Sequence, residues 1–255
     1  MSNNSRRPDS RAELAPQELP EEIAELVGEA SVAEPLSRRR RLSAQISRLA
    51  RRSGGAGWQG ARSGGRWLTA EALAMAPRLP VRDQQRLRAQ FPGLEPEELA
   101  DALIHGAARS SGVVGAAAGA AMVLPLPTAP VEILVETLAV VGIEIKLVAE
   151  LHEVYGMPAP GSTSERMLAY VAAWAQRGGV VLAPAGLILV AGSPLRRRLQ
   201  RRLMARAGRS AVSLGPLLTG TMAAALLNRR ETRRLGADVR DDLRRRSPYT
   251  VRWTG

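Results

Sequence analysis

The chain has 255 residues, a net charge of +12, 45% hydrophobic residues and only 3% aromatic residues. Its mean hydropathy of −0.11 is too low for a polytopic membrane protein and too high for a disordered chain. The absence of cysteine excludes disulfides, thiolate metal sites and a cysteine nucleophile. Ala, Leu, Val and Gly dominate the apolar stretches, so we expect an all-α multi-helix bundle that packs through small and aliphatic side chains.

The charge is distributed unevenly along the chain. Residues 193–255 hold 16 basic and 4 acidic groups, whereas residues 1–110 hold 17 and 14, and residues 111–192 hold 3 and 6. Nearly every basic residue is arginine, and Lys146 is the single lysine. The positive electrostatic field of this C-terminal quarter attracts any polyanion, whether anionic lipid, nucleic acid or an acidic protein.

One helical domain with two flanking segments is predicted. Residues 1–65 form a largely disordered basic arm with a Gly-rich linker, peripheral to the fold, although a short acidic helix at 20–29 and a basic amphipathic helix at 38–52 fit within it. Residues 66–246 form the helical domain, and 247–255 form a tail. No apolar signal segment opens the chain, so residence on the cytoplasmic side is expected, without a secretion signal.

Helices are expected at 67–76, at 80–90, and from Glu95-Pro96 onward, where proline at the first helical position is favourable. The third helix continues into a Gly/Ala segment whose small surface lets another backbone approach closely. Pro125, Pro127 and Pro130 end it. The residues expected in this helix packing are Gly112, Gly115 and Gly119.

The segment 130–156 predicts an amphipathic helix. Leu134, Leu138, Val141, Ile145, Val148 and Leu151 fall on one face, and Glu132, Lys146, Glu150 and Glu153 gather opposite, with Glu136 at the border. Lys146 and Glu150 are spaced as an i, i+4 pair. Glu144 lies away from the polar face, and the sequence does not identify its partner.

Ser162 and Glu165 have the spacing of a capping box that opens a further helix. Two apolar runs follow, at 178–194 and 209–228, each broken by proline and glycine, and helix packing is expected at Gly215, Pro216 and Gly220. A basic helix lies between the runs, and a charged helix with Leu235, Val239 and Leu243 inward closes the domain. Contact with an anionic surface is expected of Arg196, Arg197, Arg198, Arg201, Arg202, Arg206 and Arg209.

Simple membrane spans fit this pattern poorly. Two spans would place the arginine-rich loop and the arginine-rich tail on opposite sides, against the positive-inside rule. The conflict disappears if the apolar runs are kinked helical hairpins that return to the side from which they came. It disappears equally if they form the core of a soluble bundle, so a protein peripheral or re-entrant at the membrane and a fully soluble one both stay open.

Several segments taken together resemble a known family. The helix VVGAAAGAAMVLPLP, the acidic-apolar helix ending in VYG and the late segment SLGPLLTGTMAAALLNRRETRRLG resemble the EcsC-like family and a related helical domain appended to some bacterial GTPases. The resemblance covers roughly residues 95–245. It implies a helical, membrane-associated bacterial protein without assigned enzymatic activity, partnered by a membrane transporter or by a GTPase acting in trans, since the chain has no P-loop.

No catalytic, metal or cofactor constellation is apparent. The histidines, His105 and His152, lack metal-binding spacing, so we expect a non-enzymatic protein without cofactors. The predicted function is a membrane-associated accessory or scaffold protein, with an anionic lipid surface as partner. A soluble nucleic-acid-binding protein is the alternative, although base-stacking aromatic residues are scarce. The sequence predicts no oligomeric state.

Overall fold

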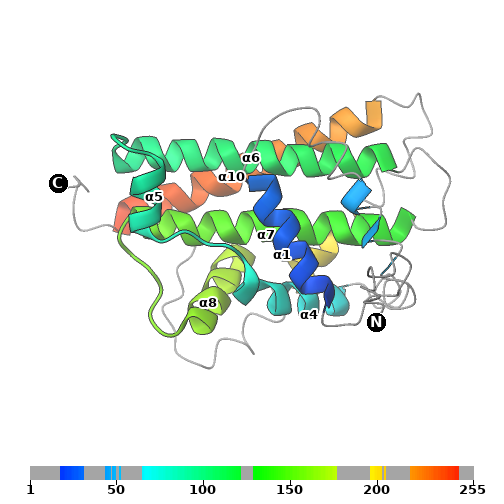
Figure 1. Cartoon of the computed structure of the whole chain (residues 1–255), viewed down its shortest axis with the longest axis horizontal. Coiled ribbons are helices and arrows are strands. Elements are labelled where there is room, and N and C mark those ends of the chain that lie inside the picture. Colours follow the sequence, from blue (N-terminus) through cyan, green and yellow to red (C-terminus); the bar gives the residue numbers. More distant parts are fainter. Residues whose placement is uncertain are drawn as a thin grey trace, which may run out of the picture.

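A computed structural model of the chain describes residues 18–31, 44–46, 48–49, 52, 65–121, 129–176, 196–202, 204 and 219–246. Every regular element in these ranges is a helix, which confirms the predicted all-α bundle (Figure 1). The expected Pro-broken hairpin at 178–194, most of that at 209–228, and the tail at 247–255 lie outside the described residues.

The helices with continuous bounds follow one another in a simple order. They are α1 (Glu18–Ser31), α4 (Gly65–Met75), a 3-10 turn η1 (Ala76–Arg78), α5 (Gln84–Gln90), α6 (Pro96–Ala121), α7 (Ala129–Val154), α8 (Thr163–Gln176) and α10 (Thr219–Arg246). Residues 196–202 and 204 are also helical, and we call them the 196–204 segment.

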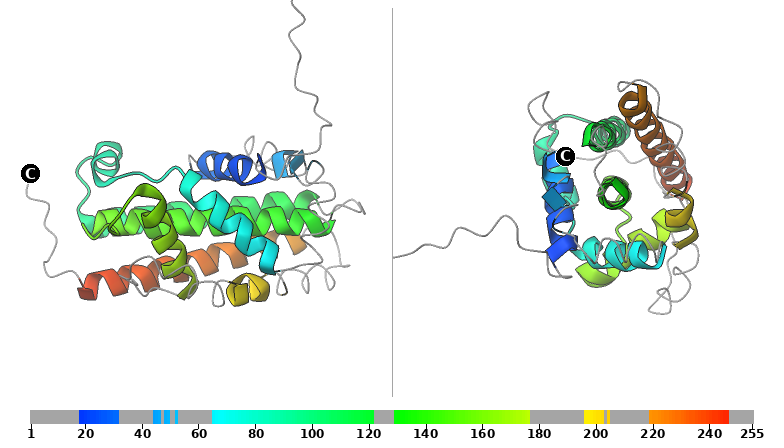
Figure 2. Two further views of the ribbon diagram at one scale, coloured as in Figure 1. Left: turned by 90° about the horizontal axis from the view of Figure 1, so that it is seen from below. Right: turned by 90° about the vertical axis from the view of Figure 1, so that its right-hand side faces the viewer.

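The central element of the bundle is α7. Figure 2 shows it end-on, with α1, α6, α10, α4 and α8 arranged around it. Almost every residue from Ile133 to Tyr155 is buried, including the whole predicted apolar face and the residues opposite to it. The helix is therefore enclosed on all sides, so the charged face of this amphipathic helix packs against other elements of the bundle and not against solvent.

The helix α1 belongs to the core. Leu19, Ile23, Leu26 and Val27 are buried in the same apolar cluster as α7. This finding corrects the expectation that everything before residue 66 is peripheral. The reason is the i, i+4, i+7 spacing of Leu19, Ile23 and Leu26, which gives α1 an apolar stripe that only the bundle can cover.

Local sequence signals set several helix ends. Asp83 caps α5 by accepting a hydrogen bond from the Arg86 backbone N–H, so this helix begins at Gln84, later than the predicted Pro80. The capping box before α8 is confirmed, because the Ser162 backbone N–H donates to Glu165 and Ser162 Oγ accepts from the Glu165 backbone.

The longest helix, α10, joins two parts that the sequence analysis treats separately. It begins at Thr219 in the second apolar run and continues to Arg246 through the charged segment. Leu235, Val239 and Leu243 are buried, as predicted. The helix packs most extensively against α6, along the side of α7 away from α1 (Figure 2).

Candidate functional site

The charged residues of α7 lie inside the bundle. Glu136, Glu144, Lys146, Glu150 and Glu153 are all buried. Burying an unpaired charge is costly, so each carboxylate requires a partner from another element. The surrounding helices supply these partners, and two polar clusters result.

The first cluster centres on Glu144, which is fully buried. Trp174 Nε1 of α8 donates a hydrogen bond to its Oε2 at 2.6 Å, and Arg202 Nη2 of the 196–204 segment donates to its Oε1 at 2.8 Å. The Thr232 hydroxyl of α10 lies 3.1 Å from the same Oε1 and 2.9 Å from Ser111 Oγ of α6. Glu144 thus joins four elements through one carboxylate.

Two arginines flank the Trp174 ring in this cluster. The guanidinium carbon of Arg198 lies 4.2 Å from a ring centroid, and that of Arg202 lies 5.4 Å away, both within cation–π range. Burial raises the pKa of Glu144, but the charge and hydrogen bond of Arg202, with help from Arg198 and Trp174, outweigh it, so this pKa lies below its usual value. The carboxylate is therefore ionised inside the bundle.

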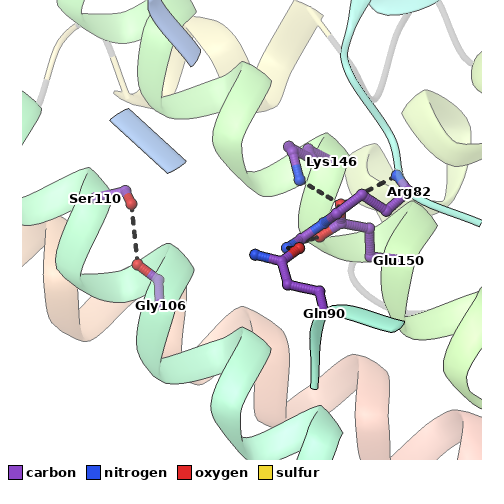
Figure 3. Close-up of polar contacts among 6 residues, drawn as sticks. All are labelled: Arg82, Gln90, Gly106, Ser110, Lys146 and Glu150. Atoms are coloured by element: carbon purple, nitrogen blue, oxygen red, sulfur yellow. Dashed lines mark hydrogen bonds and ion pairs between the residues drawn. The ribbon is translucent and has the colours of Figure 1, made fainter. Parts of the chain in front are cut away.

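The second cluster centres on Glu150 (Figure 3). Arg82 donates from Nε to Oε1 and from Nη2 to Oε2, each at 2.7 Å, and its backbone N–H donates to Oε1 at 3.2 Å. Lys146 Nζ also pairs with Oε1, one helical turn earlier on α7. Burial lowers the pKa of Lys146 below its usual value; Glu150 opposes this shift and Arg82 adds to it.

A cavity of about 90 Å³ adjoins this second cluster, between α5, α6 and α7. Its polar lining comes from Arg82, Gln90, Ser110, Lys146 and Glu150. Its other walls are Phe91, Ala102, Leu103, Gly106, Ala107, Ile143 and Leu147. The cavity therefore combines a charged end with an apolar wall.

Each of the two histidines bonds through Nδ1 to a backbone carbonyl of its own helix. His105 is exposed on α6 and donates from Nδ1 to the Asp101 carbonyl at 2.8 Å. His152 is buried on α7 and donates from Nδ1 to the Val148 carbonyl at 2.7 Å, and burial lowers its pKa. Within the part of the chain that the structure describes, no group of His, Asp and Glu side chains is arranged to hold a metal ion.

The arginines expected at an anionic surface divide into two sets. Arg196, Arg197 and Arg201 are exposed, whereas Arg206 and Arg209 lie outside the described residues. Arg198 and Arg202 point inward to Trp174 and Glu144, so the expectation that they contact a surface is wrong. The physical reason is the helical period, which places these two residues beside Leu199 on the buried side of the segment.

The glycines expected in helix packing lie where α6 meets α10. A Cβ on Gly112 would lie 3.3 Å from the Ala225 carbonyl oxygen, and one on Gly115 would lie 2.5 Å from Asn228 Nδ2. These two positions therefore sit at a close approach of two backbones. Gly119 lies in the last turn of α6, and Gly220 lies in the first turn of α10. Gly215 and Pro216 lie outside the described residues.

Sequence reasoning missed Arg82, Trp174 and Thr232 as members of these clusters. No local pattern connects them to α7, because they are distant in the chain. One usable signal exists: Arg198 and Arg202 are an i, i+4 arginine pair beside an apolar stripe, and such a pair requires a buried carboxylate.

The exposed side of α10 changes character along its length. Arg229, Arg230, Arg233 and Arg234 are exposed, and the described residues offer them no ion pair. Farther along, Arg244 pairs with Glu97, and Arg245 and Arg246 pair with Asp242. The arginines between residues 229 and 234 therefore have no ion pair among the described residues, whereas those in the last turn of the helix pair with acidic side chains.

None of the helices in the described ranges is long and apolar enough to cross a membrane. Comparison of the chain with protein families, curated proteins and solved structures gives no match. The resemblance to the EcsC-like family thus stays a prediction.

Proposed function

We propose that this chain is a non-enzymatic accessory or scaffold protein that binds the anionic cytoplasmic face of a bacterial membrane. The observation that carries the proposal is one surface, which we call the basic face. It consists of the exposed arginines of the 196–204 segment and of residues 229–234 of α10, together with three exposed apolar side chains: Arg196, Arg197, Arg201, Arg229, Arg230, Arg233, Arg234, Met204, Met222 and Leu226.

The two parts of the basic face are adjacent. Arg202 Nη2 lies 3.8 Å from Glu231 Oε2, which brings the segment against α10, and Figure 2 shows both on the same side of α7. Met204, Met222 and Leu226 are 71%, 65% and 59% exposed. Apolar side chains among uncompensated arginines suit a lipid surface, where the apolar groups enter the headgroup layer and arginines meet phosphates.

On the opposite side of the bundle, α1 itself is acidic, although Arg52 pairs there with Glu18 and Glu22. Glu18, Glu21, Glu25 and Glu29 are exposed on α1, which contains no basic residue. Figure 2 shows α1 and α10 on opposite sides of α7. A negatively charged membrane attracts one side and repels the other, so the protein binds in one orientation and leaves α1 toward the cytoplasm. A transporter or GTPase partner, as the family resemblance implies, would then meet that side.

The test is flotation with vesicles of anionic or neutral lipid, at low and high salt. The triple variant Arg230→Gln, Arg233→Gln, Arg234→Gln removes three charges from the basic face. Its matched control, Arg244→Gln, Arg245→Gln, Arg246→Gln, removes three charges from the same helix where acidic residues compensate them. Since each basic residue near an anionic surface contributes about 1 kcal/mol, the first variant is expected to bind roughly 100-fold more weakly, and the control much less so.

Binding to nucleic acid is the competing outcome. The arginines alone would grip phosphates, with an affinity that falls steeply as salt rises. The apolar residues distinguish the two: Met222→Ser with Leu226→Ser is expected to reduce vesicle binding at high salt without affecting a DNA mobility shift. Binding confined to DNA, or equal binding of both triple variants to anionic vesicles, would overturn the membrane proposal.

A further inference from the structure

The cavity beside Glu150 has the size of a small-molecule site. At about 90 Å³ it is several times larger than the roughly 10–15 Å³ that one water needs. Its walls come from three helices, and Gly106 opens part of it, because a Cβ at this position would meet nothing within 4 Å. A ligand of a few heavy atoms fits this space.

The hydrogen-bond inventory of the cavity has surplus donors. Both oxygens of Glu150 already accept from Arg82, and Oε1 also accepts from Lys146. The Lys146 ammonium has three N–H groups, and Glu150 is its single partner among the described residues. The ammonium is buried and lines the cavity, so its other two donors require acceptors that these residues do not supply.

Gln90 adds a further donor at the mouth of the cavity. Arg82 Nη1 donates to Gln90 Oε1 at 2.7 Å, which fixes the orientation of the amide. The amide nitrogen therefore points away from Arg82, on the side where α6 carries Gly106 and Ser110 (Figure 3). The cavity thus has two nitrogen donors, Lys146 Nζ and the side-chain amide nitrogen of Gln90.

Charge and shape select the ligand. The side chains of Arg82 and Lys146 carry two positive charges against the single carboxylate of Glu150, so the charged end attracts a monoanion. The remaining lining is largely apolar, with Leu103 and Phe91 among its residues, and the Phe91 ring lies 5.9 Å from the Arg82 guanidinium carbon. We infer that this cavity binds a small monocarboxylate, its oxygens accepting from Lys146 and Gln90 and its short alkyl chain against the apolar wall.

The identity of residue 146 supports this assignment. It is the only lysine in a chain with 35 arginines. A planar guanidinium would already be spread over the adjoining space, whereas a compact ammonium leaves that space open and points its donors into it. A lysine at this position thus leaves room in the cavity for the proposed ligand.

A single lysine also provides the experiment. Protein labelled with carbon-13 only in lysine gives side-chain signals from Lys146 alone, and these are followed during titration with acetate, propionate and butyrate. Saturable shifts are expected with the carboxylates, and none with sodium chloride at equal ionic strength. Gly106→Leu fills the cavity and is expected to weaken propionate binding at least tenfold, whereas Gly106→Ala, which adds a single methyl group, is expected to weaken it much less.

Three results would overturn the inference. One is the absence of saturable shifts up to about 50 mM carboxylate, a concentration at which even a weak ligand binds. A second is equal binding by folded Gly106→Leu and wild-type protein. A third is stronger binding of inorganic phosphate than of propionate. If Gly106→Leu does not fold, the wild-type titration alone decides. The cavity and the basic face lie on different sides of α7, so failure of one proposal leaves the other standing.

Discussion

The carboxylate of Glu144 on α7 lies 2.8 Å from the guanidinium of Arg202, and this ion pair is enclosed by Trp174, Arg198 and Thr232. It joins the 196–204 segment, and with it the exposed arginines of the basic face, to the central helix. The position of a surface proposed to bind membrane is therefore fixed by an interaction inside the bundle.

Glu144→Gln is expected to lower the free energy of unfolding by about 3–5 kcal/mol, because two buried arginines lose their carboxylate. Urea denaturation followed by circular dichroism measures this. The control is Glu231→Gln, which removes a partner of the same Arg202 that is 3.8 Å away and 45% exposed, and should cost less than about 1 kcal/mol. Equal losses would contradict the assigned role of Glu144.

The stability lost in Glu144→Gln should depend on pH. Because the pKa of Glu144 is lower in the folded than in the unfolded protein, its contribution is complete above the unfolded value and is lost as pH falls through the folded value. The stability difference between wild-type protein and Glu144→Gln should therefore narrow progressively below about pH 4. A constant difference would mean that the charge of Glu144 is unimportant.

Glu71 on α4 should show the opposite dependence. Burial raises its pKa to about 7, and within the described residues its Oε2 has no hydrogen-bond partner. The folded protein then holds a proton that the unfolded chain releases, so stability falls as pH rises from about 4.5 to 7. Glu71→Gln should raise the melting temperature at pH 8 and leave it nearly unchanged at pH 4. The control is Glu25→Gln, at an exposed position of α1.

The Glu150 cluster predicts two unequal effects. Glu150→Gln leaves Arg82 and Lys146 facing each other without a carboxylate, and should cost about 3–5 kcal/mol of unfolding free energy. Lys146→Met keeps the Arg82–Glu150 pair and removes a buried ammonium, so its effect should stay within about 1 kcal/mol of zero. Chemical denaturation of both proteins compares them, and a larger loss in Lys146→Met would show that the ammonium is the essential partner.

The approach of α6 to α10 predicts a contrast between two glycines on α6. A methyl group at Gly115 would lie 2.5 Å from Asn228 Nδ2 and 3.1 Å from the Ala224 carbonyl oxygen, so Gly115→Ala should cost about 1–3 kcal/mol. Gly106 has open space, so Gly106→Ala should stabilise the helix by up to about 1 kcal/mol. Thermal melts of the two variants should shift in opposite directions, and a shared direction would contradict this geometry.

Sequence reasoning recovered features that depend on local physics. The helix starts near Pro96 and Thr163, the inward residues of α10 and the small surface at Gly112 and Gly115 follow from helical period, capping chemistry and side-chain size. These signals act within a few residues, so the sequence displays them directly.

The interior of the bundle could not be predicted in the same way. On a helical wheel, Lys146, Glu150 and Glu153 form a polar stripe of the kind that water usually covers. The structure instead pairs the carboxylates with Arg82 and Arg166, which lie 68 and 13 residues away in the chain. The sequence pattern of one helix does not tell whether its charged side chains contact water or an arginine from a distant part of the chain. For the same reason it does not identify the partner of Glu144.

The charges along α7 also restrict how the bundle can assemble. Four carboxylates at successive levels meet four different partners: Glu136 meets Asn228, Glu144 meets Arg202, Glu150 meets Arg82 and Glu153 meets Arg166. If one of the surrounding segments were displaced along α7 by one turn, roughly 5.4 Å, the α7 carboxylate that it contacts would be left buried without a partner. The four carboxylates of α7 thus fix the register of the bundle, because each surrounding segment can pack at only one position along the helix.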